Sequence, residues 1–242
     1  DVLIVDASKG FKKEGKKNKL RASDIKRIVD TYISKREEPK FSRLVTKEEI
    51  RANGYNLNIP RYVNSSDDAE TWDLYATMFG GVPKVELSAM DRYWDAFAGL
   101  KNSLFKQTDT PQTEFKVTDI QKTVENHPSV VGFKNMFSEK FGGFSEILHH
   151  RLLDNMQSLN IAAEEDAITS YIFNQLEQMP LVDRFEAYQL FADKWQTISQ
   201  DLEIIQSEGF EATRMVDANW VIKKKDDKEY EVQDGWIGHV LP

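Results

Sequence analysis

The chain contains no cysteine, so it can form neither disulfide bonds nor thiolate metal sites. No apolar run approaches the roughly 20 residues that a membrane helix needs, and no secretory start is present. Glycine-rich phosphate loops are also missing, because Gly80-Gly81 and Gly142-Gly143 each end a helical apolar pattern. These absences argue against a membrane protein and a disulfide-stapled secreted domain, and the cytoplasm is the default location.

The sequence also lacks a recognisable catalytic set. Its four histidines, at 127, 149, 150 and 239, fall in no Ser-His-Asp motif. His149 and His150 are adjacent, so on a helix they point to different faces and cannot share a metal ion. We therefore assign no catalytic, cofactor-binding or metal-binding residue from the sequence.

The charge that is present is unevenly distributed. The 242 residues are 40% apolar and 30% charged, as expected for one large or two small soluble domains, and the net charge is −8. Residues 1–63 hold 16 Lys/Arg against 9 Asp/Glu, whereas residues 64–242 hold 16 against 31. Such a change of sign indicates two surfaces with different partners.

The first 63 residues carry short apolar elements. Residues 2–5 predict a strand covered on both faces, and its lack of a lead-in favours a piece of a larger protein over a trimmed start. Ser23 is a plausible N-cap for a helix, and Thr46 with Glu49 forms a capping box for a second, short helix. Residues 54–63, GYNLNIPRYV, predict an extended strand that ends near its proline. The inner stripe expected on the first helix is Ile25, Ile28, Val29, Tyr32 and Ile33.

A basic segment lies between the first strand and the first helix. It holds seven cations in thirteen residues against one acid, Glu14, and its glycines and lack of periodicity favour a loop. Lysine suits contact with nucleic-acid phosphates without base reading, although a merely solubilising loop explains the composition equally well. The DNA-backbone candidates are Lys12, Lys13, Lys16, Lys17, Lys19 and Arg21.

From residue 65 the pattern is helical almost throughout. The longest apolar stripe runs from Pro180, at a first helical position, to a stop at Gly209, with nearly heptad spacing. Most of this stripe is expected to form the core, but its length leaves room for docking a partner's helices. Residues 220–232 predict a β-hairpin across a Lys-Asp-Asp-Lys turn. The docking candidates are Phe185, Tyr188, Trp195, Ile198 and Leu202.

Three stretches together resemble the C-terminal part of the modification (M) subunit of type I restriction-modification systems. They are VLIVDASKGF with the following basic segment and LRASDIKRIVDTY, then GYNLNIPRYV, and finally the helical stretches FGGVPKVELSAMDRYWDAF and PLVDRFEAYQLFADKWQTISQDLEII. The resemblance implies a DNA adenine methyltransferase that uses S-adenosyl-L-methionine and flips its target base out of the duplex. The partners that it implies are the specificity (S) subunit, the restriction (R) subunit and double-stranded DNA, without a membrane.

The chain departs from the family pattern because its catalytic Asn-Pro-Pro-Phe/Tyr motif and glycine-bearing cofactor motif are both absent. We therefore expect a mainly α protein that is inactive by itself and binds no S-adenosyl-L-methionine. Residues 1–63 would be a small α/β remnant of the methyltransferase domain, and 64–242 a helical partner-binding domain with a short β-hairpin near its end. A stand-alone helical adaptor with a basic nucleic-acid-contacting loop is the main alternative, and a nucleic-acid chaperone is a third.

Overall fold

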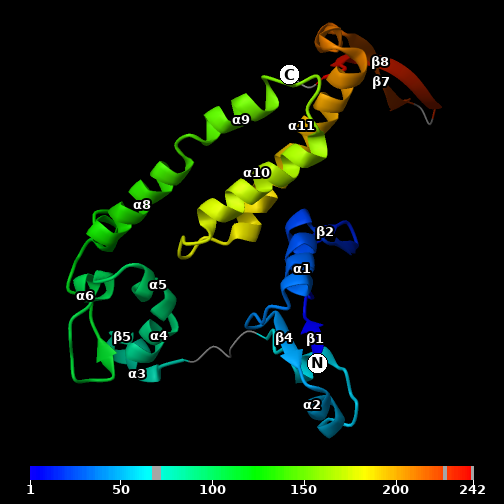
Figure 1. Ribbon diagram of the computed structural model, residues 1–242. Helices are drawn as coiled ribbons and strands as arrows, with labels where there is room; N and C mark the ends of the chain where they lie inside the picture. Colours follow the sequence, from blue (N-terminus) through cyan, green and yellow to red (C-terminus); the bar gives the residue numbers. More distant parts are fainter. Residues whose placement is uncertain (67–71, 226–227, 241–242) are drawn as a thin grey trace. The chain divides into compact units, whose positions relative to one another are not determined.

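The computed structural model describes residues 1–66, 72–225 and 228–240 (Figure 1). Over these ranges the protein is mainly α-helical with four two-stranded antiparallel sheets, which confirms the predicted fold class. It has two compact units, residues 1–142 with 178–185 and residues 143–177 with 186–242. The predicted boundary near residue 63 concerns the methyltransferase remnant and stays a prediction.

The N-terminal sheet pairs β1 (Val2–Val5) with β4 (Ser42–Val45) in antiparallel register, Val2 opposite Val45. The predicted first strand is therefore confirmed. The predicted burial of both faces of this strand is wrong. Within β1, Ile4 is the one buried residue, and Val2 is 38% exposed. A two-stranded ribbon covers only part of each strand. The small core on this sheet comprises Ile4, Val45, Ile50, Tyr62 and Val63.

Helix α1 (Ala22–Ser34) turns its polar face inward. It begins after Arg21, and the predicted cap, Ser23, is buried inside its first turn. The side chain of Thr31 is fully buried, whereas four members of the predicted inner stripe are 46–73% exposed. The prediction of an apolar inner face is wrong within this chain because ion pairs, described below, hold the polar face. The four exposed members are Ile25, Val29, Tyr32 and Ile33.

The segment after β4 contains one confirmed and one wrong prediction. Helix α2 (Lys47–Ala52) is confirmed and starts with the Thr46 hydroxyl accepting a hydrogen bond from the Glu49 amide at 3.2 Å, which is one half of the predicted capping box. The Glu49 carboxylate bonds instead to Arg43. The predicted strand over 54–63 is instead a turn followed by the 3₁₀ helix η1 (Ile59–Arg61). Gly54 and Tyr55 have φ values of 64° and 59°, so two successive left-handed residues reverse the chain where a strand would need extended backbone.

Residues 72–142 form a cluster of short helices around one core. The apolar residues over 87–104 recur at helical spacing, but they are divided among three helices, because the chain leaves helical geometry at Met90 and at Gly99, whose φ is 84°. Strands β5 (Val82–Pro83) and β6 (Gln112–Thr113) pair beside them. The core residues are Leu87, Leu100, Leu104, Phe105 and Val130. The helices are α3 (Leu74–Phe79), α4 (Lys84–Ala89), α5 (Asp91–Ala96), α6 (Leu100–Leu104), α7 (Ile120–Glu125) and α8 (Pro128–Phe141).

The second unit combines three helices with a long hairpin (Figure 1). Helix α9 spans Phe144–Leu152, α10 spans Ile161–Leu176, and most of α11 (Arg184–Glu208) belongs here. The one-turn helix η2 (Phe210–Arg214) leads into the predicted hairpin, which is confirmed as β7 (Val216–Lys225) and β8 (Lys228–Gly238). The pairing shifts register near Gly235, whose φ of 89° suits a bulge, and the expected turn at 226–227 lies outside the described residues.

Helix α11 is the long helix that the apolar stripe predicts. It starts at Arg184 and not at Pro180, because Leu181 adopts a left-handed φ of 65° that a helix cannot contain. Its 25 residues give a length of about 37 Å at 1.5 Å per residue. Gly209, with a φ of 77°, follows its last residue as predicted.

His239 ties the end of α11 to the start of β7. Its Nδ1 lies 3.2 Å from a carboxylate oxygen of Glu208, and its Nε2 lies 3.0 Å from one of Asp217. Both ring nitrogens donate only when the imidazole is charged. The hydrogen bond to Glu208, followed by that to Asp217, accordingly raises the pKa of His239 above its ordinary value.

We expect this link to make the stability of the second unit depend on pH. A raised folded-state pKa contributes stability below the unfolded pKa, about 6.5, and the contribution is lost as pH rises through the folded pKa. His239→Gln should therefore be less stable than the wild type near pH 6, and the two should converge at higher pH. Urea unfolding of both proteins from pH 6 upward measures the difference in their free energies of unfolding. A difference that does not change with pH would show that charged His239 does not stabilise the unit.

Candidate nucleic-acid interface

The basic segment folds into a β-hairpin, so the prediction of a loop is wrong. Strand β2 (Lys12–Glu14) pairs with β3 (Lys17–Lys19) across the two-residue turn Gly15-Lys16. Gly15 has a φ of 61°, which suits the first central position of a type II′ turn, one of the two turns that match strand twist in tight hairpins. The glycine that suggested a loop is the residue that permits the hairpin.

Hairpin register divides the cations between two faces. Cross-strand partners share a face, so Lys12 with Lys19 and Glu14 with Lys17 lie on one side, and Lys13 with Asn18 lies on the other. The face with three lysines is the cationic face. Its acid, Glu14, pairs with Lys19 at 3.4 Å, but both side chains are about 70% exposed, so water screens the pair.

Four of the six predicted DNA-backbone residues remain exposed without an ion pair among the residues that the structure describes. They are Lys12, Lys13, Lys16 and Lys17. Lys19 pairs with Glu14, and Arg21 lies at the base of the hairpin. The hairpin therefore brings Lys12, Lys17 and Lys19 together on the cationic face, with Lys16 at its tip.

Arg21 anchors the base of the hairpin to α1. Its Nε and one terminal nitrogen each lie 3.0 Å from a carboxylate oxygen of Asp24, and its backbone amide donates to the same carboxylate at 2.8 Å. Burial opposes ionisation of Asp24, but these bonds outweigh it and hold the pKa of Asp24 below its usual value. Arg21 thus has a structural role, and its guanidinium fork is directed at a protein carboxylate.

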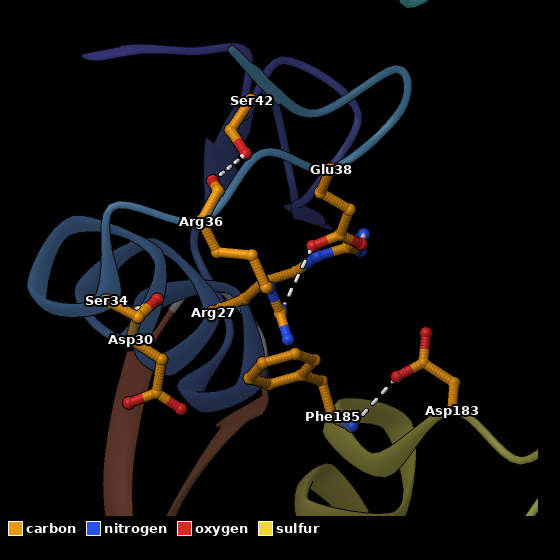
Figure 2. A network of polar contacts seen from close by, with 8 residues as sticks. All are labelled: Arg27, Asp30, Ser34, Arg36, Glu38, Ser42, Asp183 and Phe185. Atoms are coloured by element: carbon orange, nitrogen blue, oxygen red, sulfur yellow. Dashed lines mark hydrogen bonds and ion pairs between the residues drawn. The ribbon is translucent and has the colours of Figure 1, made fainter. Parts of the chain in front are cut away.

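A second network fixes the polar face of α1 to the segment that follows it (Figure 2). Arg27 bonds to the Glu38 carboxylate, which also contacts Arg36 at 3.3 Å. The Arg27 guanidinium lies 4.2 Å from the centre of the Phe41 ring. Ser42 donates to the Arg36 carbonyl at 2.8 Å (Figure 2). These contacts explain why α1 keeps its charged face inward and its apolar face outward.

The predicted docking residues of the long helix differ in accessibility. Phe185, Trp195 and Leu202 are buried, Tyr188 is partly buried, and Ile198 is 37% exposed. A groove of about 440 Å³ runs between α9 and α11, with Asp201 and His149 among its lining residues. Its apolar lining includes Leu148, Leu152, Met156, Ile198, Leu202 and Ile205.

Comparison with known proteins identifies the class to which the first part of the chain is similar. Residues 1–71 match the model of the N-6 DNA Methylase family. This range contains β1, the basic hairpin, α1, β4 and α2, together with two of the three stretches on which the resemblance rests. The resemblance to DNA methylases is therefore confirmed over this range.

The chain is also similar to methylase subunits of type I restriction enzymes. The MpnII methylase subunit of Mycoplasma pneumoniae is 37% identical over 73 residues, which are 30% of this chain and 13% of the relative. The MjaVII methylase subunit of Methanocaldococcus jannaschii is 36% identical over 95 residues, 37% of this chain and 16% of the relative. The aligned segments thus cover less than a fifth of these relatives. No solved structure is significantly similar to the chain.

Two features are absent from the residues that the structure describes. No three His, Cys, Asp or Glu side chains among them are grouped to hold a metal ion. Within the same residues no helix has the length and apolar character needed to cross a membrane.

Proposed function

We propose that this chain is part of the modification subunit of a type I restriction-modification enzyme, which methylates adenine in DNA with S-adenosyl-L-methionine. The observation that carries the proposal is the match of residues 1–71 to N-6 DNA methylases, together with relatives named as type I methylase subunits. In this proposal residues 1–63 are an edge of the catalytic domain, and the later helices bind the specificity subunit. The restriction subunit joins the same assembly.

The strands described in residues 1–66 do not form the kind of site that binds S-adenosyl-L-methionine. Doubly wound domains bind nucleotide cofactors at the carboxyl ends of parallel strands. Between residues 1 and 66, the described strands form two antiparallel pairs, β1–β4 and β2–β3, which provide no such crevice. We therefore expect the 242-residue chain alone to transfer no methyl group, with the cofactor site supplied by the rest of the parent protein.

The exposed face of α1 supports a catalytic-domain origin. It presents Ile25, Val29, Tyr32 and Ile33 at 46–73% exposure, although their helical spacing is typical of a buried face. In the proposed parent, the remaining sheet of the methylase domain covers this face. The polar side of α1 is already fixed by Arg21–Asp24 and Arg27–Glu38, so the helix would present a preformed surface.

DNA contact in this proposal comes from the basic hairpin. A two-stranded ribbon is narrow enough to approach a groove, and its lysines suit phosphates, not base edges. The second unit carries 18 acidic and 7 basic residues by sequence, so it repels DNA and suits a basic protein surface instead. The expected binding is independent of DNA sequence and sensitive to salt.

The groove between α9 and α11 is the proposed docking site for the specificity subunit. Ile198 lines it and is accessible, whereas Leu190 on the same helix is 74% exposed and does not line it. We expect Ile198→Asp to weaken co-purification with the specificity subunit of the proposed enzyme, because a carboxylate would be buried without a partner. Leu190→Asp is the matched control and should retain binding. Equal retention by both variants would remove the groove from the interface.

A further inference from the structure

A second cationic site lies in the helical cluster of residues 72–142, away in sequence from the basic hairpin. A pocket of about 460 Å³ opens between α4, α6 and the loop that follows α6. Lys84, Lys101 and Lys106 line it, and Asp109 is the acidic residue in its lining. The volume falls in the range of small-molecule sites, about 300–1,000 Å³.

Two of the three lysines have ammonium groups that no strong ion pair neutralises, so their charge can attract a ligand. The Lys84 ammonium donates to the carbonyl oxygen of Thr108, a neutral acceptor that fixes its position without cancelling its charge. Lys101 lies 3.9 Å from Asp91, and both side chains are at least 40% exposed, so that pair is weak. Lys106 differs, because its ammonium pairs with Glu114 at 2.7 Å.

The pocket also has an apolar floor and a polar rim. Leu87 and Phe105 are buried, and the Phe105 ring packs 4.6 Å from that of Phe115 and 6.1 Å from that of Trp94, measured between centroids. Asn102 is exposed on the same turn of α6 as Lys101 and brings amide donors to the rim. Lysine ammonium groups beside a rigid apolar floor suit a ligand in which a phosphate is attached to a flat, apolar ring system.

We propose that this pocket binds a phosphate group carried by a nucleotide-sized ligand, with Lys84 and Lys101 as the anion contacts and Phe105 and Leu87 as the floor. The phosphate could belong to a free nucleotide or to a nucleotide of a DNA strand, and the chemistry of recognition is the same. The site lies outside residues 1–71, which match the methylase family, so it does not depend on the proposed function.

The test measures binding of adenosine 5′-monophosphate, adenosine, inorganic phosphate and a short DNA duplex to the full chain by titration calorimetry and ³¹P NMR. We expect the monophosphate to bind more tightly than adenosine or phosphate alone. Lys101→Met removes a cation that no strong internal contact needs, and Asn102→Asp adds a repelling charge. Each should weaken monophosphate binding about tenfold at about 50 mM salt.

Lys134→Met, on the exposed surface of α8, is the matched control and should bind as the wild type does. Duplex binding that falls with Lys101→Met identifies DNA as the source of the phosphate. If substitution of the hairpin lysines weakens duplex binding and Lys101→Met does not, the ligand of the pocket is a free nucleotide. If none of the probes binds, or if Lys101→Met and Asn102→Asp bind the monophosphate as the wild type does, the pocket is not a phosphate site.

Discussion

Replacing Trp195 by alanine is expected to destabilise the second unit by about 3–5 kcal/mol, the usual cost of removing a buried aromatic side chain. Trp195 lies in the middle of α11, is 3% exposed, and its ring packs 5.4 Å from that of Phe191. Such a loss is a large fraction of the roughly 5–15 kcal/mol that stabilises a typical domain. Urea unfolding followed by near-ultraviolet circular dichroism measures the change.

Two matched variants sharpen this prediction. Leu190→Ala lies on the same helix at 74% exposure and should leave stability nearly unchanged. Trp195→Phe should cost less than the alanine, because it keeps a ring and removes the indole N–H, which has no hydrogen-bond partner within the described ranges. If Trp195→Ala proved no more harmful than Leu190→Ala, burial of Trp195 would not be what stabilises the second unit.

Reversing charge on the cationic face of the hairpin is expected to abolish most duplex binding. Lys12 and Lys17 lie on the same face, so Lys12→Glu with Lys17→Glu replaces two attractive charges with two repulsive ones. The slope of log K against log salt should become shallower by about 0.9 for every phosphate that the variant no longer neutralises. At about 50 mM salt we expect affinity to fall at least a hundredfold, measured by fluorescence anisotropy on duplexes of unrelated sequence.

The neighbouring lysine provides the control for this face. Lys13 is adjacent in sequence to Lys12, but hairpin register places it on the opposite side with Asn18. Lys13→Glu should therefore weaken binding less than Lys12→Glu does. Equal effects would mean that only net charge matters, and unchanged binding in the Lys12/Lys17 double variant would exclude the hairpin from DNA contact.

The contrast between α2 and residues 54–63 shows which local features the sequence could predict. The Thr46–Glu49 cap acts between neighbouring residues, so the sequence alone identified the helix and its start. The alternation at Tyr55, Leu57 and Ile59 is equally regular, but a strand also needs a pairing partner. Here Gly54 and Tyr55 reverse the chain, and the three side chains are 38–68% exposed.

The hairpin and the first helix show how partners decide structure. Gly15 is compatible with both a loop and a type II′ turn, and cross-strand pairing decided between them. The stripe on α1 was identified correctly as apolar, but its orientation was wrong, because Arg27 pairs with Glu38 from a segment eleven residues away. Spacing predicts which residues share a face, and tertiary contacts decide where that face points.

The lysine pocket could not be found from spacing at all. Lys84 and Lys101 are 17 residues apart and sit on different helices, with the breaks at Met90 and Gly99 between them. A single continuous helix that carried both lysines would separate them by about 26 Å along its axis, at 1.5 Å per residue. The helix breaks therefore create the site, and only the folded arrangement shows its lining.

Transfer of labelled methyl groups tests most directly the proposal that this chain is part of a type I adenine methylase. The proposed full-length parent, mixed with the proposed specificity subunit, labelled S-adenosyl-L-methionine and duplex DNA, should place label on the exocyclic nitrogen of adenine. The 242-residue chain in the same assay should place none. Label on another base, no label with the full assembly, or turnover by the chain alone would contradict the account.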